Sequence, residues 1–220
     1  MFKENVSRTS GLPFKIDHTE AQAVEHLAEK FFCLVQEHGR ERQLVIVCIG
    51  TDRSTGDALG PLVGSKLSAR LMEQQHVTVY GTLEAPVHAV NLKETIQEIE
   101  STYDNPFVIA IDACLGQLSS VGLVTLAHGP LKPGAGVNKV LPEVGEFHIT
   151  GIVNVGGFME YFVLQNTRLS VVMRMADCIA DSLHMAIMHT DFAPLKQQDV
   201  PKTTLADRWS ALRSNLFPSG

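Results

Sequence analysis

The sequence predicts an α/β fold, specifically a three-layer α/β/α sandwich with a mostly parallel open sheet. Two apolar runs, QLVIVCI at 43–49 and PFVIAID at 106–112, are rich in β-branched residues and show no polar alternation. Runs of this kind are typical of strands that are covered on both faces. Segments with helical periodicity separate the expected strands, and this alternation favours helices packed on both faces of one sheet.

The first half of the chain alternates between helices and strands. Thr19 is a candidate N-cap, and the helix that follows has apolar residues at three- to four-residue spacing. Pro61 falls in the first turn of the next helix, where its missing N–H costs little. In order, the expected elements are a helix closed by Gly39, a strand over 43–49, a helix from 57–61 to about Gln74, a strand over 77–82, a helix over about 90–101 and a strand over 106–112.

The second half of the chain contains a long connection. The segment GPLKPGAGVNKVLPEVG is 17 residues long, and a loop of that length inside a compact domain is usually functional or mobile. The other expected elements are a strand over 121–127, a strand over 147–153 and helix from about 158 to 188. We expect a break in this helix near Gln165, Asn166 and Thr167, where Asn166 or Thr167 can cap the part that follows. We expect a flexible N-terminal segment over 1–17, a single domain over 18–190 and a tail over 191–220.

Composition and charge argue against several classes of protein. The net charge is −6 and no basic run occurs, whereas phosphate contacts demand clustered Lys and Arg, so nucleic acid is not expected as a partner. No apolar stretch reaches the roughly 18 residues that span a bilayer, and the polar N-terminus lacks a signal-peptide core. We therefore expect a cytoplasmic protein with no membrane partner. The four cysteines, Cys33, Cys48, Cys114 and Cys178, are far apart and are expected to be reduced core thiols.

Polar residues follow the predicted strands at the edge where ligands bind in open α/β sheets, outside the carboxyl ends of the strands. The loop after the first strand, the loop after the second and the end of the third should meet there. Two carboxylates brought together at such an edge can share a proton, so that one acts as base and the other as acid, or can hold a metal. The candidates are Asp52, Arg53, Ser54, Thr55, Asp57, Glu84, His88 and Asp112.

Each candidate also has a structural interpretation. Asp57 has the position of a helix N-cap, and Asp112 that of a turn residue that ends a strand. Ser54 and Thr55 are more often loop and capping residues, and His88, His128 and His148 are more often surface or satisfied core histidines. The chain contains no P-loop, no GxGxxG after the first strand, no GxSxG elbow and no HExxH, which argues against an NTPase, a Rossmann dehydrogenase, an α/β-hydrolase and a zincin.

Four blocks occur in order over about residues 40–188: GTDRSTGDALGPLVG, IAIDACLG, LKPGAGVNK and HITGIVNVGGFMEYFVLQNTRL. Together they resemble the YyaC family, which is associated with sporulation. That family is similar to the germination protease that degrades small acid-soluble spore proteins and, more distantly, to hydrogenase maturation endopeptidases. The resemblance implies the phosphorylase/hydrolase-like α/β/α sandwich and a place in the sporulating cell or spore core.

The same resemblance implies roles for individual residues. The two catalytic aspartates proposed for the germination protease match Asp57 and Asp112. The maturation endopeptidases bind a divalent metal through two acidic residues, which match the same pair, and a His, for which His148 is the choice by position, with His88 and His128 behind it. The PGAGV stretch flanks the site, so Gly134 and Gly136 are expected to let the backbone approach a substrate. Ser54, Thr55 and His88 are the other candidate substrate contacts.

Three functional hypotheses remain open from the sequence. The first is a peptidase in which the aspartate pair activates water, directly or through one divalent transition metal, to cleave a small basic or unfolded spore protein. The second is a non-catalytic binding or regulatory protein of sporulation that keeps the fold. The third is a metal-dependent amidase that acts on something other than protein. The sequence leaves the oligomeric state open, a homo-oligomer included.

Overall fold

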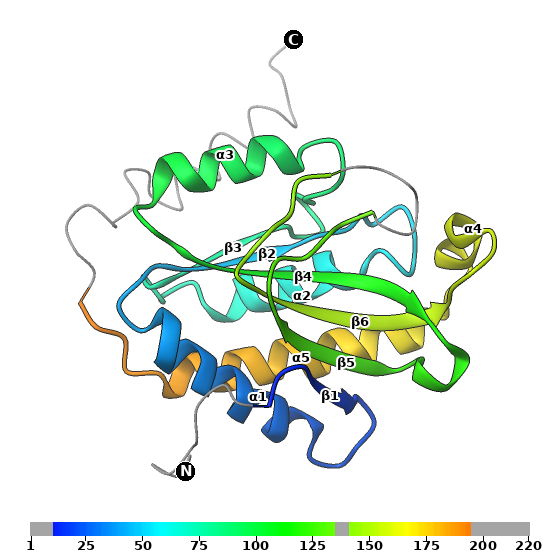
Figure 1. The fold of residues 1–220 in the computed structure, drawn as a ribbon, viewed down its shortest axis with the longest axis horizontal. Helices are drawn as coiled ribbons and strands as arrows, with labels where there is room; N and C mark the ends of the chain where they lie inside the picture. The colour runs from blue at the N-terminus through cyan, green and yellow to red at the C-terminus, as the bar shows by residue number, and fades with distance from the viewer. Residues whose placement is uncertain (1–10, 135–140, 195–220) are drawn as a thin grey trace.

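The computed structural model describes residues 11–134 and 141–194 and has the α/β architecture that the sequence predicts (Figure 1). The helices and strands, in chain order, are β1 (Phe14–Asp17), α1 (Ala23–Leu34), β2 (Leu44–Cys48), α2 (Leu59–Arg70), β3 (Val77–Tyr80), α3 (Leu92–Thr102), β4 (Phe107–Gly116), β5 (Leu123–His128), β6 (Phe147–Val155), α4 (Glu160–Gln165) and α5 (Leu169–His189). A π-helical turn, Val35–Gly39, extends α1, and a short 3-10 turn, Leu118–Ser120, precedes β5.

The six strands form one sheet in the order β1-β5-β6-β4-β2-β3. Strands β3, β2, β4 and β6 are parallel to one another, whereas β5 pairs antiparallel with both β6 and β1. The sheet is therefore mostly parallel, with an antiparallel extension on one side. The parallel part places the carboxyl ends of β2, β4 and β6 at the same edge.

Helices cover both faces of this sheet. Helices α1, α2 and α5 lie on one face and α3 lies on the other (Figure 1). Alternate residues of β2 serve the two faces, since Leu44 and Ile46 pack with α1, α2 and α5, while Val45 and Val47 pack with α3. Both faces of β2 are thus buried, which explains why its sequence is apolar without alternation. The predicted three-layer sandwich is confirmed.

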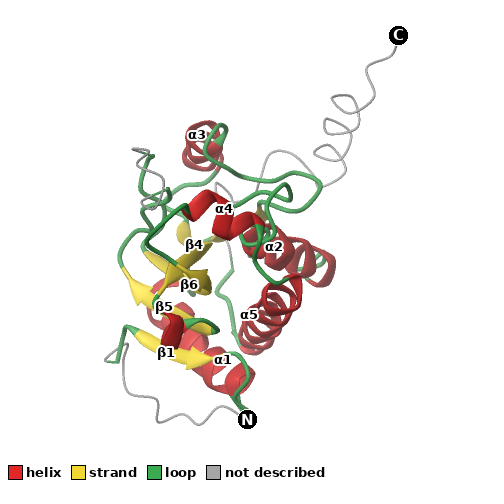
Figure 2. Cartoon of the chain, turned by 90° about the vertical axis from the view of Figure 1, so that its right-hand side faces the viewer, coloured by secondary structure: helices red, strands yellow, loops and turns green. Residues whose placement is uncertain are grey.

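Helix α4 lies outside these layers, beside the ends of β4 and β6 (Figure 1). Figure 2, which looks directly at that end of the molecule, shows α4 in front of the two strands. The Gly56 N–H donates to the Leu164 carbonyl at 2.9 Å, so α4 is also bonded to the loop that follows β2. This short helix therefore borders the edge where the site was predicted.

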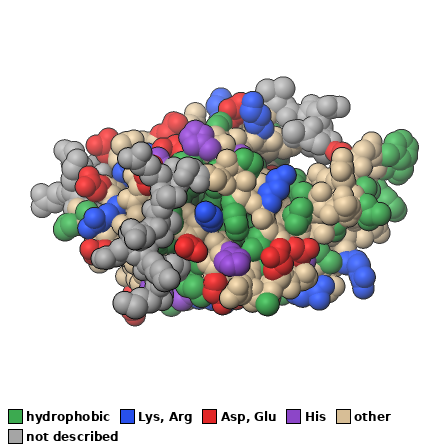
Figure 3. All heavy atoms as spheres, turned by 60° about the horizontal axis from the view of Figure 1, so that its bottom comes forward, with side chains coloured by type: hydrophobic (Ala, Val, Ile, Leu, Met, Phe, Trp, Pro, Cys, Tyr) green, Lys and Arg blue, Asp and Glu red, His purple; other side chains and the backbone are tan. Residues whose placement is uncertain are grey.

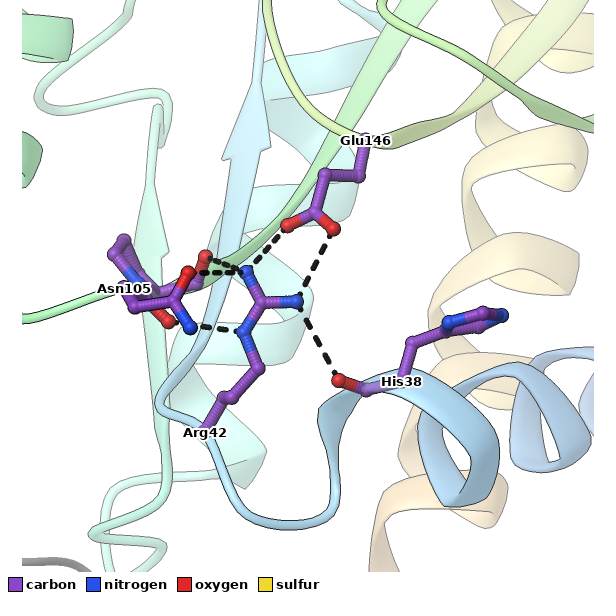
Figure 4. Close-up of polar contacts among 5 residues, drawn as sticks. His38, Arg42, Asn105 and Glu146 are labelled. Carbon is purple, nitrogen blue, oxygen red and sulfur yellow. Dashed lines mark hydrogen bonds and ion pairs between the residues drawn. The ribbon is translucent and has the colours of Figure 1, made fainter.

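The opposite end of the sheet is fastened by Arg42 (Figure 4). Its guanidinium donates to both carboxylate oxygens of Glu146, at 2.6 and 3.1 Å, to the carbonyls of Asn105 and Pro106, at 2.9 and 2.7 Å, and to the Asn105 side chain. These partners precede β4 and β6, and Arg42 itself precedes β2. One side chain therefore ties together the segments that enter three neighbouring strands.

Several element boundaries differ from the sequence-based expectation. Residues 14–17 of the expected flexible segment form the edge strand β1, because they pair with β5; residues 1–10 of that segment lie outside the described part. Thr19 is not the N-cap of α1: its N–H and hydroxyl bond the Asp17 carboxylate, at 2.8 and 2.7 Å, and the helix begins after Gln22. Neither Asn166 nor Thr167 caps α5, whose N-cap is Arg168.

The burial of the cysteines and the length of the helices can also be compared with the expectations from the sequence. All four cysteines are free; Cys48 and Cys178 are buried as expected, but Cys33 and Cys114 are only half-buried. Within the described ranges, no helix is long and apolar enough to cross a membrane. The predicted tail over 191–220 is described only as far as residue 194.

Candidate functional site

The three segments that were expected to meet at the carboxyl edge lie side by side. The Ile49 N–H donates to the Ile111 carbonyl at 2.7 Å, which joins the end of β2 to β4. The Gly50 N–H donates to the Val87 carbonyl at 2.8 Å, which brings the segment after β3 against the same point. The prediction that these loops converge is therefore confirmed at the level of the backbone.

The loop after β2 closes on itself and so fixes Asp57. The Thr51 N–H donates to the Asp57 carbonyl at 3.2 Å. Gly50 has a φ of +146°, and a Cβ there would overlap the same carbonyl, so only glycine fits this turn. A Cβ at Gly60 would likewise overlap the Ile49 carbonyl oxygen. The glycines of the GTDRSTGDALG block therefore let the start of α2 press against the strand end, with Asp57 held between them.

Asp112 lies inside β4 and not at its end. It pairs with Thr150 of β6, and β4 continues to Gly116. Its Oδ1 accepts the Ala113 N–H at 2.8 Å. The backbone groups of Phe107 and Ile111 form hydrogen bonds on the side of β4 that faces β2. Alternate residues of a strand direct their backbone groups to the same side, so the Ala113 N–H also points to the β2 side. The Asp112 carboxyl is thereby drawn towards the side on which β2 has ended and the Asp57 loop begins.

The pKa values of both carboxyls are raised. Burial raises the pKa of Asp57. The pKa of Asp112 is raised well above its ordinary value, first by burial and then by the negative charge of Asp57, while the Ala113 N–H acts in the opposite direction. Asp112 as a whole residue is half-buried. A pair of this kind favours the state in which one carboxyl holds a proton and the other is ionised.

The structural interpretations of these two residues are not supported. The N-cap of α2 is Ala58, and no side chain makes a capping bond there. Asp57 therefore does not serve as the cap of this helix. Asp112 does not end a strand, because four further residues of β4 follow it. Both acidic side chains are thus placed at the carboxyl edge without a capping or turn-forming role.

The structure describes four of the five candidate substrate contacts. Ser54 is buried, and its hydroxyl has no hydrogen-bond partner within the part of the chain that the structure describes. Thr55 is half-buried in the same loop. His88 is half-buried, and its Nδ1 accepts the Val90 N–H at 3.3 Å. Gly134 has a φ of +73°, and Gly136 lies outside the described residues. Their roles as substrate contacts stay predictions.

The expected metal ligands do not converge. His148 pairs with Ala110, two residues before Asp112, and its Nδ1 is bonded to the Gly129 carbonyl at 2.8 Å. Among the described residues, no group of three or more His, Cys, Asp or Glu side chains is arranged to hold a metal ion. In the part of the chain that the structure describes, no third ligand is therefore grouped with Asp57 and Asp112, and a metal at this site stays a prediction.

Sequence reasoning placed Cys114 in the core, but the structure places it beside the site. Asp112 and Cys114 are two residues apart in β4 and so face the same side of the sheet. Burial raises the pKa of the Cys114 thiol, a hydrogen bond with Thr150 lowers it, and the nearby charge of Asp112 raises it further. The two-residue spacing in IDAC was the available signal, but it points to the site only once Asp112 is known to lie within the strand.

Comparison with known proteins gives two matches. Residues 15–182 match the family model described as "Protein of unknown function (DUF1256)". The chain is also 55% identical over 170 residues to "Uncharacterized protein YyaC" of Bacillus subtilis (strain 168), an alignment that covers 77% of this chain and 82% of that protein. The first match includes both Asp57 and Asp112. Both descriptions leave the activity open.

Proposed function

The chain belongs to the DUF1256 family, its resemblance to the YyaC family is confirmed, and we propose from this premise that it is a peptidase in which Asp57 and Asp112 activate water. The observation that supports the proposal is that the loop holding Asp57 starts where β2 ends beside β4, the strand that holds Asp112. Burial raises the pKa of each, and the charge of Asp57 raises the pKa of Asp112 further. Such coupling is typical of acid–base pairs in active sites.

The pKa shifts assign a role to each residue. Asp112, whose pKa is raised more strongly, holds the proton, and Asp57 is ionised. Asp57 takes a proton from water as the water oxygen attacks the peptide carbonyl carbon, and Asp112 gives its proton to the carbonyl oxygen. When the C–N bond breaks, the leaving nitrogen takes the proton from Asp57, and a hydroxyl proton returns to Asp112. General acid–base assistance is worth roughly 10²–10⁴-fold in rate.

A divalent metal remains an alternative route for the same residues. When bound, it would lower the pKa of a coordinated water and so supply hydroxide. Asp57 and Asp112 are the two ligands that the described residues provide, and no third ligand is grouped with them. The roles derived above therefore belong to the aspartates alone. Elemental analysis of the purified protein, and of the Asp57→Asn variant, tests the metal prediction separately from activity.

The substrate that we propose is a small basic or unfolded protein of the spore. The net charge of −6 favours a basic partner through long-range attraction. The sporulation context comes from the family resemblance described in the sequence analysis. An unfolded chain is also a better substrate than a folded one, because its peptide bond has to enter a partly enclosed site to reach the two carboxylates.

The test is incubation of the purified protein with protein extracted from spores. We expect specific fragments with the wild type and none with Asp57→Asn or Asp112→Asn. Asp104→Asn is a matched control, because it removes the same charge from an exposed residue that precedes the start of β4, whereas Asp112 lies towards the other end of that strand. Equal cleavage by all four proteins would refute the mechanism. Binding of a spore protein without cleavage by the wild type would instead support the non-catalytic hypothesis.

A further inference from the structure

Strand β4 extends beyond its neighbour β2 at the candidate site. The β2–β4 pairing ends at Cys48 and Ile111, followed by one further bond from the Ile49 N–H. β4 then continues to Gly116 and is paired there only with β6. Over its last residues, β4 is therefore an edge strand in the middle of the sheet, on the side where β2 has ended.

The backbone groups on that edge can be identified from the alternation of the strand. Odd-numbered residues of β4 point towards β2, as Phe107 and Ile111 do, whereas the carbonyls of Val108 and Gly116 bond on the β6 side. Ala113 and Leu115 therefore point to the open side. The Ala113 N–H is taken by Asp112, but the Ala113 carbonyl and both backbone groups of Leu115 have no hydrogen-bond partner within the described ranges. Three backbone groups without a partner among the described residues thus lie one to three positions after Asp112 in β4.

A strand added to a sheet forms hydrogen bonds with backbone N–H and carbonyl groups of the edge strand, such as the Ala113 carbonyl and the two backbone groups of Leu115. An extended polypeptide can join a free sheet edge through its main chain, which gives affinity without a fixed sequence. We propose that the segment 113–115 of β4 binds an extended segment of an unfolded polypeptide as an added strand. This inference rests on the proposed peptidase function, because the added strand would present its peptide carbonyls to Asp57 and Asp112.

A second feature lies next to the same edge. Four side chains between the end of β6 and the middle of α4 are highly exposed for apolar residues: Phe158 (82%), Met159 (58%), Tyr161 (66%) and Phe162 (56%). Figure 3 shows hydrophobic side chains gathered at the end of the molecule where Figure 1 places α4. Exposed apolar patches of this kind often mark interaction sites.

This apolar surface follows directly on the last residue of β4. The Gly156 N–H donates to the Gly116 carbonyl at 2.9 Å, so the segment that leads into α4 starts at the end of β4. An extended chain that pairs with 113–115 would therefore reach α4 with its flanking residues. Unfolded proteins expose apolar side chains that folded ones bury, so the patch favours the same class of partner as the edge.

The probe for this proposal is pancreatic ribonuclease A, used in two forms. Reduced and carbamidomethylated ribonuclease is unfolded and basic, and the native enzyme has the same sequence but is folded. Binding of the fluorescein-labelled forms is measured by anisotropy with the Asp57→Asn protein, which does not cleave. We expect the unfolded form to bind and the native form not to bind.

A proline at position 115 tests the edge. Leu115→Pro removes a donor from the open side and should weaken binding about tenfold or more, since several main-chain bonds depend on this alignment. Leu118→Pro is the matched control: the Leu118 N–H has no partner among the described residues, and Gln117 before it is extended, with φ −75° and ψ 153°, as proline requires. The control should bind within about twofold of the parent.

Hydrogen exchange tests the same edge without a substitution in β4. In the Asp57→Asn protein, the Leu115 amide should exchange quickly alone and be protected when unfolded ribonuclease is bound, while the amide of Lys15 in the distant edge strand β1 should not change. If Leu115→Pro fails to fold, this measurement decides. Protection of Leu115 without the probe, or no protection with it, would overturn the proposal, because the edge would then already be covered or would not be used.

The outcomes separate this inference from the proposed function. If the wild type cleaves unfolded ribonuclease, and a folded Leu115→Pro variant binds and cleaves it equally well, the peptidase proposal is supported and the proposed binding at the edge of β4 is refuted. Protection of Leu115 and loss of binding in Leu115→Pro, with no cleavage by the wild type, would support the edge and contradict the peptidase.

Discussion

The most discriminating prediction concerns the stability of the Asp112→Asn variant. Burial and the charge of Asp57 oppose ionisation of Asp112, so its pKa in the folded protein lies above its ordinary value of 3.8. Between these two pKa values the folded protein binds a proton that the unfolded chain has released. The free energy of unfolding therefore falls as the pH rises through that window, and the loss persists at higher pH. Asparagine has the same shape, carries no charge and should remove this loss.

The size of the effect follows from the surroundings of the carboxyl. In the Asp112→Asn variant the side-chain amide oxygen can still accept the Ala113 N–H, so the hydrogen bond seen in the structure is kept. What changes is that the folded variant no longer has to hold a proton at position 112 at a pH at which the unfolded chain has released it, and no cation among the described residues offsets the rise in the pKa of Asp112. We expect the variant to be more stable at pH 7 by on the order of 1–3 kcal/mol. For a domain of this size that corresponds to a rise in Tm of roughly 2–12 °C.

The assay is thermal unfolding followed by circular dichroism between about pH 4 and pH 8. The difference in Tm between the variant and the wild type should be small near pH 4 and should grow as the pH rises. Asp104→Asn, an exposed change of the same charge, should show no such pH dependence. A variant that is less stable than the wild type at neutral pH, or a difference that does not vary with pH, would refute the idea that folding raises the pKa of Asp112.

Three further variants test other parts of the structure. Arg42→Met should lower the free energy of unfolding by about 1.5–3 kcal/mol in denaturant titrations, because its charged hydrogen bonds to the segments before β4 and β6 are lost. Arg40→Met, which breaks an exposed pair, should cost less than about 1 kcal/mol. Gly64→Ala should cost about 1–3 kcal/mol or more, since its Cβ would overlap a backbone carbonyl after β3, and a stable variant would contradict the close packing of α2. Ser54→Ala should leave the Tm unchanged or raise it slightly, because its buried hydroxyl has no partner in the described chain; a clear fall would reveal one.

The central part of the fold could be predicted from the sequence because it depends on local patterns. The apolar runs of β2 and β4 and the helical periodicity around them specify a sheet that is covered on both faces. β1 could not be predicted in this way: its four residues form a strand only because β5, more than a hundred positions later, pairs with them. The start of α1 was missed for a related reason, since Asp17 at the end of β1 binds Thr19 and delays the helix.

The candidate site was predictable in part. The meeting of the loop after β2 with the end of β4 follows from parallel strands whose carboxyl ends share one edge, and the backbone bonds of Ile49 and Gly50 confirm it. The sequence did not show that Asp112 lies inside a strand, because the extension of β4 depends on its register with β6. Nor did it show that the Nδ1 of His148 is bonded to the Gly129 carbonyl, which is a contact between distant segments.

The difference in length between β2 and β4 accounts for the main features of the site. If β2 continued beside β4, its backbone would occupy the open side, the Ala113 N–H would have a strand partner, and the loop carrying Asp57 would begin further from Asp112. Because β2 ends at Cys48, the loop turns back at Gly50, Asp57 comes beside the unpaired part of β4, and the Asp112 carboxyl turns towards it to accept the Ala113 N–H. The acidic pair and the open strand edge are therefore two consequences of one early strand ending. This is the physical reason to expect catalysis and polypeptide binding at the same place.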